Sequence, residues 1–356
     1  MQGSNLDHNS SMSHPAISAA APGTIFSPCS GSGLRLGLGG APLGNLFASV
    51  SDADTRALVD AAWGRGCRTF DTAPHYGHGL SERRLGDALR GHPRDEYLLS
   101  SKVGRILTPD AQAPRAQHGY VDILPFSQHW DYSAAGTRRS VEDSLQRLGL
   151  ARLDVAYVHD PDAATHGERA PAVLRQLIDE TLPALEQLKR EGLIRHLGLG
   201  TNDVAVVLQV LHEAPLDVLM LAGRYSLLDH SALAELLPLC AQRGVRIALG
   251  GVFNSGILAT GARGSAKPTF NYAPAAAEWL ARTARIESVC EAHGVPLRAA
   301  ALQFPLAHPA VDIVMLGARH AAEWDDAQAM LQHPVPAAFW AALRAEGLLP
   351  QDAPTP

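Results

Sequence analysis

The sequence predicts an α/β fold, a (β/α)₈ TIM barrel, and three observations lead to this prediction. Eight short apolar segments bounded by turn residues recur along the chain, and such segments are typical of buried parallel strands. Segments with apolar residues three and four apart, which indicate helices with one buried face, fill most of the intervals. The alternation extends over about 300 residues, which matches the size of such a barrel.

The predicted strands are residues 34–42, 69–73, 97–104, 153–160, 194–200, 217–223, 245–251 and 311–317. A doubly wound sheet is the alternative α/β fold, and it usually carries a GxGxxG motif directly after its first strand. The first predicted strand contains Gly37 and Gly39, but Pro42 stands in the place of the third glycine. The motif is therefore incomplete, and the sequence favours the barrel.

The predicted helices are residues 51–66, 81–91, 137–150, 170–192, 202–214, 231–244, 275–294 and 323–333. The first of them opens with Ser51 and Asp52, which are good N-cap residues, and it ends at Gly66. Two connections, residues 105–133 and 259–274, are unusually long and each follows a predicted strand. In a barrel, both would rise from the face on which sites form.

The length suits one large domain or two ordinary ones, and from the eightfold alternation we expect a single barrel domain at residues 34–345. Residues 1–33 are rich in Ser, Ala, Pro and Gly without an apolar period, so we expect a disordered N-terminal extension, and we expect a tail at residues 346–356. The net charge is −6 with acids and bases interspersed, which argues against a nucleic-acid partner. No apolar run is long enough to predict a membrane span.

Targeting signals and cysteine usage favour a cytoplasmic protein. The N-terminal residues lack the positive charge and the apolar stretch of a signal peptide. The four cysteines show no CxxC spacing and fit reduced thiols better than disulfides: Cys29, Cys67, Cys240 and Cys290. His75 and His78 could imitate a zinc site, but no HxH or HExxH spacing is present, so no metal is predicted. A metal hydrolase stays an alternative.

Four polar residues lie at or just after the ends of three neighbouring predicted strands. Asp71 ends the second strand, and Tyr76 lies five residues further on in the following loop. Lys102 ends the third strand and His159 ends the fourth. Because adjacent strands lie about 4.8 Å apart, these side chains can converge in one pocket.

Together these four residue types can move a proton to or from one oxygen atom. A free tyrosine titrates near pH ~10, and a lysine ammonium beside it favours the phenolate. An aspartate would hold the lysine charged, and a neutral histidine could orient a substrate oxygen. If the chemistry is redox, the hydride must be exchanged with a cofactor.

The stretches that carry these residues resemble the aldo-keto reductases. They are FDTAPHYG (70–77), LSERRLGDAL (80–89), SSKVG (100–104) and VHD (158–160), followed by LGLGTND, GGVFNSGIL and VMLGAR. The resemblance covers residues 34–332, and it is strongest to the D-threo-aldose 1-dehydrogenase (L-fucose dehydrogenase) branch. It implies a nicotinamide-dependent (β/α)₈ barrel that oxidises C1 of an aldose to the lactone. The implied substrates are sugars of the L-fucose, L-galactose or D-arabinose type.

The resemblance also implies a role for each catalytic residue. Tyr76 takes the proton of the C1 hydroxyl as general base, and Lys102 lowers the pKa of Tyr76. Asp71 pairs with Lys102, and His159 positions the sugar oxygen. His75, Trp130 and Asp160 are expected to line the substrate pocket.

The implied cofactor is NAD or NADP. The residues matched to its site are Thr201, Asn202, Tyr225, Phe253, Asn254, Ser255, Gly256, Leu258, Gly317, Ala318, Arg319 and Glu323. Glu323 would repel a 2′-phosphate whereas Arg319 would attract one, and we lean to NAD. Two positions depart from the family: Ala222 stands where many relatives have Gln, and Gly250 where many have an aromatic residue.

Other functions remain open at this stage. The nearest is oxidation of pyridoxal to its lactone by a similar barrel, followed by a general aldehyde or ketone reductase. A non-catalytic, nucleotide-binding regulatory subunit is the alternative from another class. We expect a small-molecule substrate and either a monomer or a homodimer.

Overall fold

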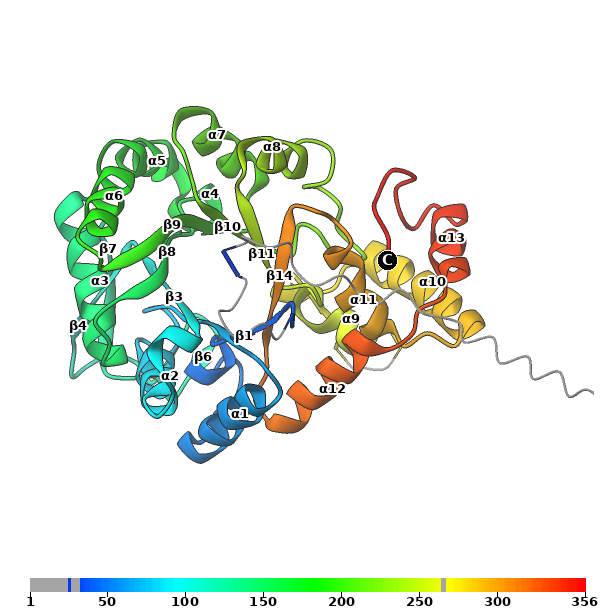
Figure 1. Cartoon of the computed structure of the whole chain (residues 1–356), viewed down its shortest axis with the longest axis horizontal. Coiled ribbons are helices and arrows are strands. Elements are labelled where there is room, and N and C mark those ends of the chain that lie inside the picture. The colour runs from blue at the N-terminus through cyan, green and yellow to red at the C-terminus, as the bar shows by residue number, and fades with distance from the viewer. Residues whose placement is uncertain (1–24, 27–32, 264–266) are drawn as a thin grey trace, which may run out of the picture.

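The computed structural model describes residues 25–26, 33–263 and 267–356. Eight parallel strands form a closed barrel in the order β1, β14, β11, β10, β9, β8, β3, β2 (Figure 1). Their bounds are β1 (Leu36–Gly39), β2 (Thr69–Asp71), β3 (Leu98–Val103), β8 (Leu153–His159), β9 (Ile194–Thr201), β10 (Val218–Ala222), β11 (Arg246–Gly250) and β14 (Val311–Gly317). These are the eight predicted strands, and the (β/α)₈ prediction is confirmed.

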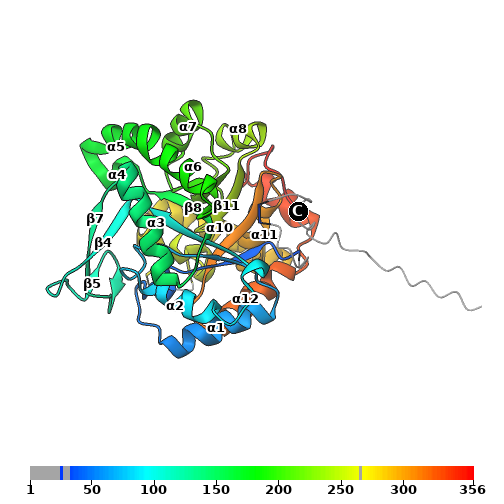
Figure 2. The same cartoon turned by 60° about the vertical axis from the view of Figure 1, so that its left-hand side comes forward.

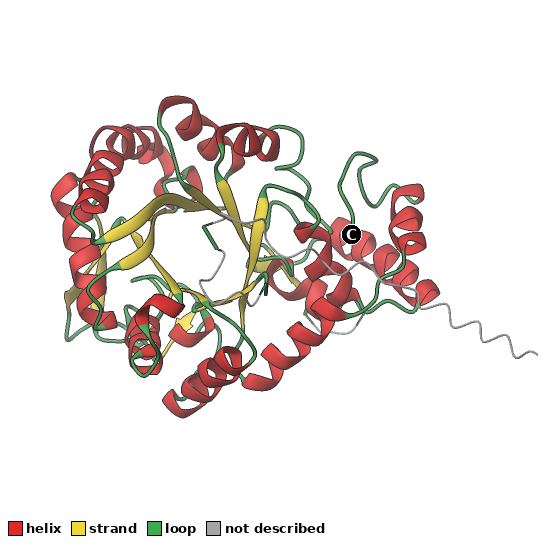
Figure 3. Ribbon diagram, in the orientation of Figure 1, coloured by secondary structure: helices red, strands yellow, loops and turns green. Residues whose placement is uncertain are grey.

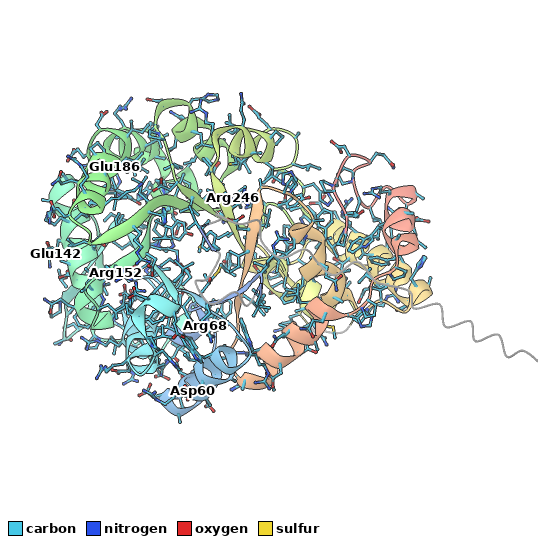
Figure 4. The ribbon with its side chains drawn as sticks, viewed as in Figure 1. Asp60, Arg68, Glu142, Arg152, Glu186 and Arg246 are labelled. Atoms are coloured by element: carbon cyan, nitrogen blue, oxygen red, sulfur yellow. The ribbon has the colours of Figure 1, made fainter. Side chains whose placement is uncertain are left out.

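Helices surround the barrel as an outer ring (Figure 3). The long ones are α1 (Asp52–Gly64), α2 (Leu80–Leu89), α3 (Ala134–Leu148), α6 (Leu182–Arg190), α7 (Val204–Glu213), α8 (Leu236–Arg243), α10 (Ala277–His293), α11 (Leu297–Leu306), α12 (Ala321–Gln332) and α13 (Ala337–Ala345). Shorter helical segments are η1 (Pro42–Gly44), η2 (Arg94–Glu96), α4 (Ala163–His166), η3 (Gly167–Arg169), α5 (Ala170–Gln176), η4 (Leu177–Thr181), η5 (Asn254–Gly256) and α9 (Ile257–Thr260). The charged side chains of Asp60 and Glu142 lie on the outer face of this ring (Figure 4).

Side-chain caps fix where several helices begin. Ser51 accepts from the backbone N–H of Asp54 at the start of α1, as its sequence predicts.

The helices α11 and α13 lie outside the predicted set. Residues 299–306 of α11 are buried throughout, so the segment has no polar face to reveal a helical period.

The barrel interior is filled by inward-facing side chains of its strands. They are Val155, Tyr157, Val218, Met220, Ala248, Ile313 and Met315, and Phe26 packs among them. Phe26 is 4% exposed, so this part of the predicted N-terminal extension lies inside the barrel. Residues 1–24 and 27–32 of that extension lie outside the described residues. At the other end, Leu348 and Ala353 are buried, so the predicted C-terminal tail packs on the domain.

Both long connections contain short antiparallel hairpins. The first pairs β4 (Arg105–Pro109) with β7 (Phe126–Trp130), and β5 (Ala116–Gln117) with β6 (Tyr120–Val121). Figure 2 shows this segment extending from the barrel beside α3. The second connection pairs β12 (Thr269–Phe270) with β13 (Ala273–Pro274). None of the helices in the described part of the chain is long and apolar enough to cross a membrane.

Candidate active site

Asp71 and Tyr76 are held by the tight loop that leads from β2 into α2. The Tyr76 N–H donates to the carbonyl of Ala73 at 3.0 Å, which closes a turn. Gly77 has φ +66°, and a Cβ on it would lie 2.4 Å from the Gly44 carbonyl oxygen. Only glycine fits this left-handed close approach, so FDTAPHYG folds Tyr76 back over the carboxyl ends of the strands.

Lys102 binds both members of that loop. Its Nζ donates to Asp71 Oδ2 at 2.7 Å, to the Thr72 carbonyl at 3.0 Å and to the Tyr76 hydroxyl at 3.0 Å. Asp71 also accepts from Ser100 Oγ at 2.6 Å. Lys102 and Asp71 are each 3% exposed, so the charges form a buried pair whose remaining bonds are satisfied.

The pKa of the Tyr76 phenol lies well above its ordinary value. Burial is the main cause, and the Asp71 carboxylate adds to it, whereas the Arg105 guanidinium opposes it. The lowering of this pKa by Lys102 stays a prediction, and burial of the phenol raises the pKa in the structure without cofactor or substrate. In this state Tyr76 keeps its proton at neutral pH.

His159 ends β8, and the centroid of its ring lies 6.1 Å from the centroid of the Tyr76 ring. It is 7% exposed, and its carbonyl accepts from the Tyr132 hydroxyl at 2.8 Å. Burial holds the pKa of His159 well below its usual range, and the positive charges of Arg105 and Lys102 lower it further. His159 is therefore a neutral imidazole, as predicted for a group that orients an oxygen.

These side chains open into a cavity of about 490 Å³ at the carboxyl ends of the strands. Of the predicted site residues, the structure brings Tyr76, Lys102, His159, His75, Asp160, Thr201 and Asn202 to its wall. Asp71 lies behind Lys102. The other lining residues include Leu46, Phe47, His118, Tyr120, Met220, Ala222 and Tyr272.

The predicted pocket residues divide into two groups. His75 and Asp160 line the cavity, and His75 Nδ1 lies 3.0 Å from Gln128 Oε1. Burial lowers the pKa of His75 to about 3, with Arg105 contributing. The prediction for Trp130 is corrected: its ring packs 4.1 Å from the Arg105 guanidinium and does not belong to the cavity wall.

The predicted cofactor residues after β11 form a strained turn. Asn254, Ser255 and Gly256 have φ values of 46°, 63° and 115°. Asn254 Nδ2 donates to the Gly223 carbonyl at 3.2 Å, and Asn254 Oδ1 accepts from Ser226 Oγ at 2.6 Å. These bonds use both ends of the Asn254 amide, which fixes the turn beside β10.

Two predicted cofactor residues have buried side chains. Tyr225 is 1% exposed and packs against Phe304 at 5.1 Å between ring centroids, and Leu258 is fully buried. Both side chains belong to the hydrophobic core. Phe253 is half-buried and packs against the same core.

The predicted adenosine segment begins at the end of β14. Gly317 is exposed beside Pro42, whereas Ala318 is buried. The Arg319 guanidinium donates to Glu323 Oε1 at 2.8 Å, and the Arg319 backbone N–H donates to Glu323 Oε2 at 2.8 Å. Glu323 is therefore already paired within its own turn.

The residues at the end of β10 and β11 leave room for a planar ring. Ala222 and Gly250 are register partners, and a Cβ on Gly250 would meet only Ala222, at 3.8 Å. Thr201 and Asn202 border this space in the cavity wall. The small side chains at these two positions therefore leave open space at the carboxyl ends of β10 and β11.

Sequence reasoning missed several residues in or next to this cavity. Arg105 lies behind the wall against His159 and Asp160, and its place directly after SSKVG was a usable signal. Tyr120 and His118 lie in the long first connection, where no periodic pattern marks them. Phe47 and Tyr272 are 63% and 65% exposed, and both have φ +63°. Among the described residues, no group of His, Cys, Asp and Glu is arranged to hold a metal ion.

Comparison with known proteins agrees with this geometry. The Aldo/keto reductase family matches residues 35–346. The chain is 43% identical to pyridoxal 4-dehydrogenase of Microbacterium luteolum and 38% identical to D-threo-aldose 1-dehydrogenase of Pseudomonas sp. Each comparison covers 88% of this chain and 94% of the relative. Among solved structures, aldo-keto reductase AKR11C1 from Bacillus halodurans, in its holo form, matches with a TM-score of 0.67 and 25% identity. That match covers 87% of this chain and 91% of the other.

A closed barrel with a buried Asp, Lys and Tyr in contact, and a histidine facing them, thus agrees with a family match over nearly the whole domain. Members of this family exchange hydride with NAD(P)H. The chain belongs to the aldo/keto reductase family of oxidoreductases.

Proposed function

We propose that this protein oxidises the hemiacetal carbon of a cyclic substrate to a lactone, with NAD(P)⁺ as hydride acceptor. The observation that carries the proposal is the contact between Lys102 and the Tyr76 hydroxyl, 3.0 Å, on the same cavity wall as His159. A hydroxyl placed between Tyr76 and His159 meets one proton carrier and one neutral hydrogen-bond donor. The same chemistry applies to a sugar and to any other cyclic hemiacetal.

The reaction divides between the cofactor and the side chains. When bound, the oxidised nicotinamide accepts the hydride from the hemiacetal carbon and adds a positive charge to the cavity. The hydroxyl proton passes to Tyr76 Oη, and the C–O bond becomes the lactone carbonyl. Tyr76 must be ionised to take this proton, and the Lys102 ammonium, 3.0 Å from the Tyr76 hydroxyl, favours the ionised form against the burial that raises the Tyr76 pKa.

Pyridoxal in its cyclic hemiacetal form is the first candidate substrate. The rings of Tyr120, His75 and Phe47 lie on the cavity wall, with Met220 among them. Tyr120 stacks with Tyr76, with centroids 6.1 Å apart. These surfaces suit a flat aromatic ring, and the relative at 43% identity is a pyridoxal dehydrogenase.

An aldose of the L-fucose, L-galactose or D-arabinose type is the second candidate. Asp160 and Asn202 line the same cavity, and the Asp160 carboxylate is 27% exposed. Such groups can bind the several hydroxyls that distinguish a sugar from pyridoxal. The relative at 38% identity acts on an aldose.

NAD is the preferred cofactor in this proposal. Glu323 holds the Arg319 guanidinium through Oε1 and places a carboxylate beside it. A paired arginine is less available to a 2′-phosphate, and the carboxylate repels that phosphate. The support is the geometry of this one ion pair.

A substrate panel tests the proposal. Initial rates are measured with pyridoxal, L-fucose and D-arabinose, each with NAD⁺ and with NADP⁺, and products are identified by mass spectrometry. We expect a lactone from at least one of the three substrates. Reduction of open-chain aldehydes without any hemiacetal oxidation would overturn the proposal in favour of a general reductase.

A further inference from the structure

Arg105 is a buried cation in contact with His159, and it is not one of the four predicted catalytic residues. It is 7% exposed and begins β4, directly after Gly104. Gly104 has φ +105°, and a Cβ there would lie 2.6 Å from the Tyr132 ring. Only glycine makes this sharp change of direction between β3 and β4, which turns Arg105 toward the end of β8.

The guanidinium makes three contacts at that position. One nitrogen lies 2.5 Å from His159 Nδ1, and the other donates to Asp160 Oδ2 at 3.0 Å. Its carbon lies 4.1 Å from the centroid of the Trp130 ring, which covers one face. Planar contacts on an aromatic ring and a carboxylate fix the orientation of an arginine.

The contact with Nδ1 determines the tautomer of His159. An arginine guanidinium carries only N–H donors and no acceptor. His159 Nδ1 must therefore be an unprotonated acceptor, and the proton of the neutral ring lies on Nε2. His159 Nε2 lies 3.3 Å from Asp160 Oδ2, and His159 is one of the residues that line the cavity.

The same contact opposes a second proton on the ring. A proton on Nδ1 would point at an N–H donor 2.5 Å away, and the imidazolium would lie beside the guanidinium. Lys102 adds a second positive charge, and His75 packs 6.0 Å away between ring centroids. Asp160 is the carboxylate facing this group, and it is shared with Arg105. The neighbours together keep His159 neutral.

We propose that Arg105 is the positioning residue for His159, which it holds as the neutral tautomer with its proton on Nε2. His159 then presents a single N–H donor to the substrate oxygen and takes no part in the transfer of the proton. Tyr76 is left as the only proton carrier. The arrangement separates two groups that could otherwise exchange roles, one for orientation and one for acid–base chemistry.

Nitrogen NMR tests the proposal without substrate or turnover. In ¹⁵N-labelled protein, the His159 signals are assigned by their loss in His159→Gln. We expect the Nε2–H tautomer without titration from pH 5 to 8. In Arg105→Met, we expect His159 to populate both tautomers, and its pKa to rise relative to the unchanged protein while burial still holds it below the ordinary value. An unchanged, non-titrating Nε2–H signal in that variant would overturn the proposal.

Two further variants separate positioning from folding. Arg94 resembles Arg105 at the other end of β8: it donates to Asp154 Oδ2 at 2.6 Å and lies 4.8 Å from the centroid of the Tyr97 ring. Arg94→Met should destabilise the protein but leave the His159 spectrum unchanged. Arg105→Gln keeps an N–H donor without the charge, so it should retain the tautomer and raise the pKa of His159. If Arg105→Met does not fold, Arg105→Gln decides: a His159 that begins to titrate at no higher pH than in the unchanged protein also contradicts the proposal.

The kinetic consequence rests on the proposed function. Misplacing an orienting group by about 1 Å can cost on the order of 10²-fold in rate, so we expect a loss of that order in kcat/KM for Arg105→Met. An acidic limb should appear in its pH profile, and Arg105→Lys should restore part of the acid tolerance because it retains the charge. Lack of activity on all hemiacetals would reject the proposed function but leave the NMR result valid.

Discussion

The Lys102 ammonium lies 3.0 Å from the Tyr76 hydroxyl and 2.7 Å from Asp71 Oδ2. One buried cation therefore joins a proton carrier in a loop to an acid at the end of β2. The lysine cannot leave this position without stranding the carboxylate, because both are 3% exposed. The geometry of the proton transfer and the stability of the barrel thus depend on the same contact.

Tyr76→Phe should abolish most turnover. The change deletes the hydroxyl that carries the proton but keeps the ring against Tyr120. General acid–base groups contribute about 10²–10⁴-fold, so we expect a loss of this size in kcat. Coenzyme affinity, measured by fluorescence quenching, should stay close to that of the unchanged protein. Activity within a few-fold of normal would show that another group moves the proton.

Lys102→Met should destabilise the protein by about 3–5 kcal/mol, because it leaves the Asp71 carboxylate buried without its partner. The double variant Lys102→Met/Asp71→Asn removes that charge and should recover much of the loss in urea unfolding. Its activity should remain low, with the apparent pKa of hemiacetal oxidation raised, since the ammonium no longer favours the phenolate. An unchanged pH profile in the folded double variant would mean that Lys102 does not tune Tyr76.

Gly104→Ala should lower both stability and activity. A left-handed conformation costs a residue other than glycine about 1–2 kcal/mol, and the new Cβ would also strike the Tyr132 ring. Gly149→Ala is the matched control, because Gly149 has φ +66° with open space around it. We expect the control to lose stability alone and to keep its kcat/KM. Equal activity losses in the two variants would argue against a specific role for the Gly104 turn.

Acid should destabilise the folded chain partly through His75. Its folded pKa of about 3 lies below the ordinary value of about 6.5, so the unfolded state binds a proton that the folded state does not. This contribution is fully present above pH 6.5 and is lost as the pH falls toward 3. Urea unfolding at pH 7.5 and pH 5 should show a smaller loss for His75→Gln than for the unchanged protein. Identical losses of unfolding free energy in the two proteins would show that groups other than His75 cause the acid sensitivity.

Glu323→Gln should improve the use of NADP⁺ relative to NAD⁺. It removes the carboxylate that pairs with Arg319 and repels a phosphate, while it keeps a side chain of nearly the same size. The ratio of kcat/KM for the two cofactors measures the change. If kcat/KM falls by the same factor with both cofactors, the ion pair supports the turn and does not select the cofactor.

The sequence by itself predicted the barrel and its eight strands, because short apolar runs and helical periods are local patterns. It also marked Asp71, Tyr76, Lys102 and His159, since each stands at or just after a strand end. The sequence could not reveal α11, which is buried along most of its length. It also could not show that Trp130 packs against the Arg105 guanidinium. Those outcomes depend on what packs against each side chain.

Only the tertiary structure decided the electrostatics of the site. The sequence could place a lysine near a tyrosine, but it could not show that burial holds the Tyr76 pKa well above its ordinary value. It could name His159, but the neighbour that sets its tautomer comes from a hairpin 54 residues away in the chain. Proximity in a closed barrel and exclusion of water are properties of the whole fold, and they set the protonation of each group.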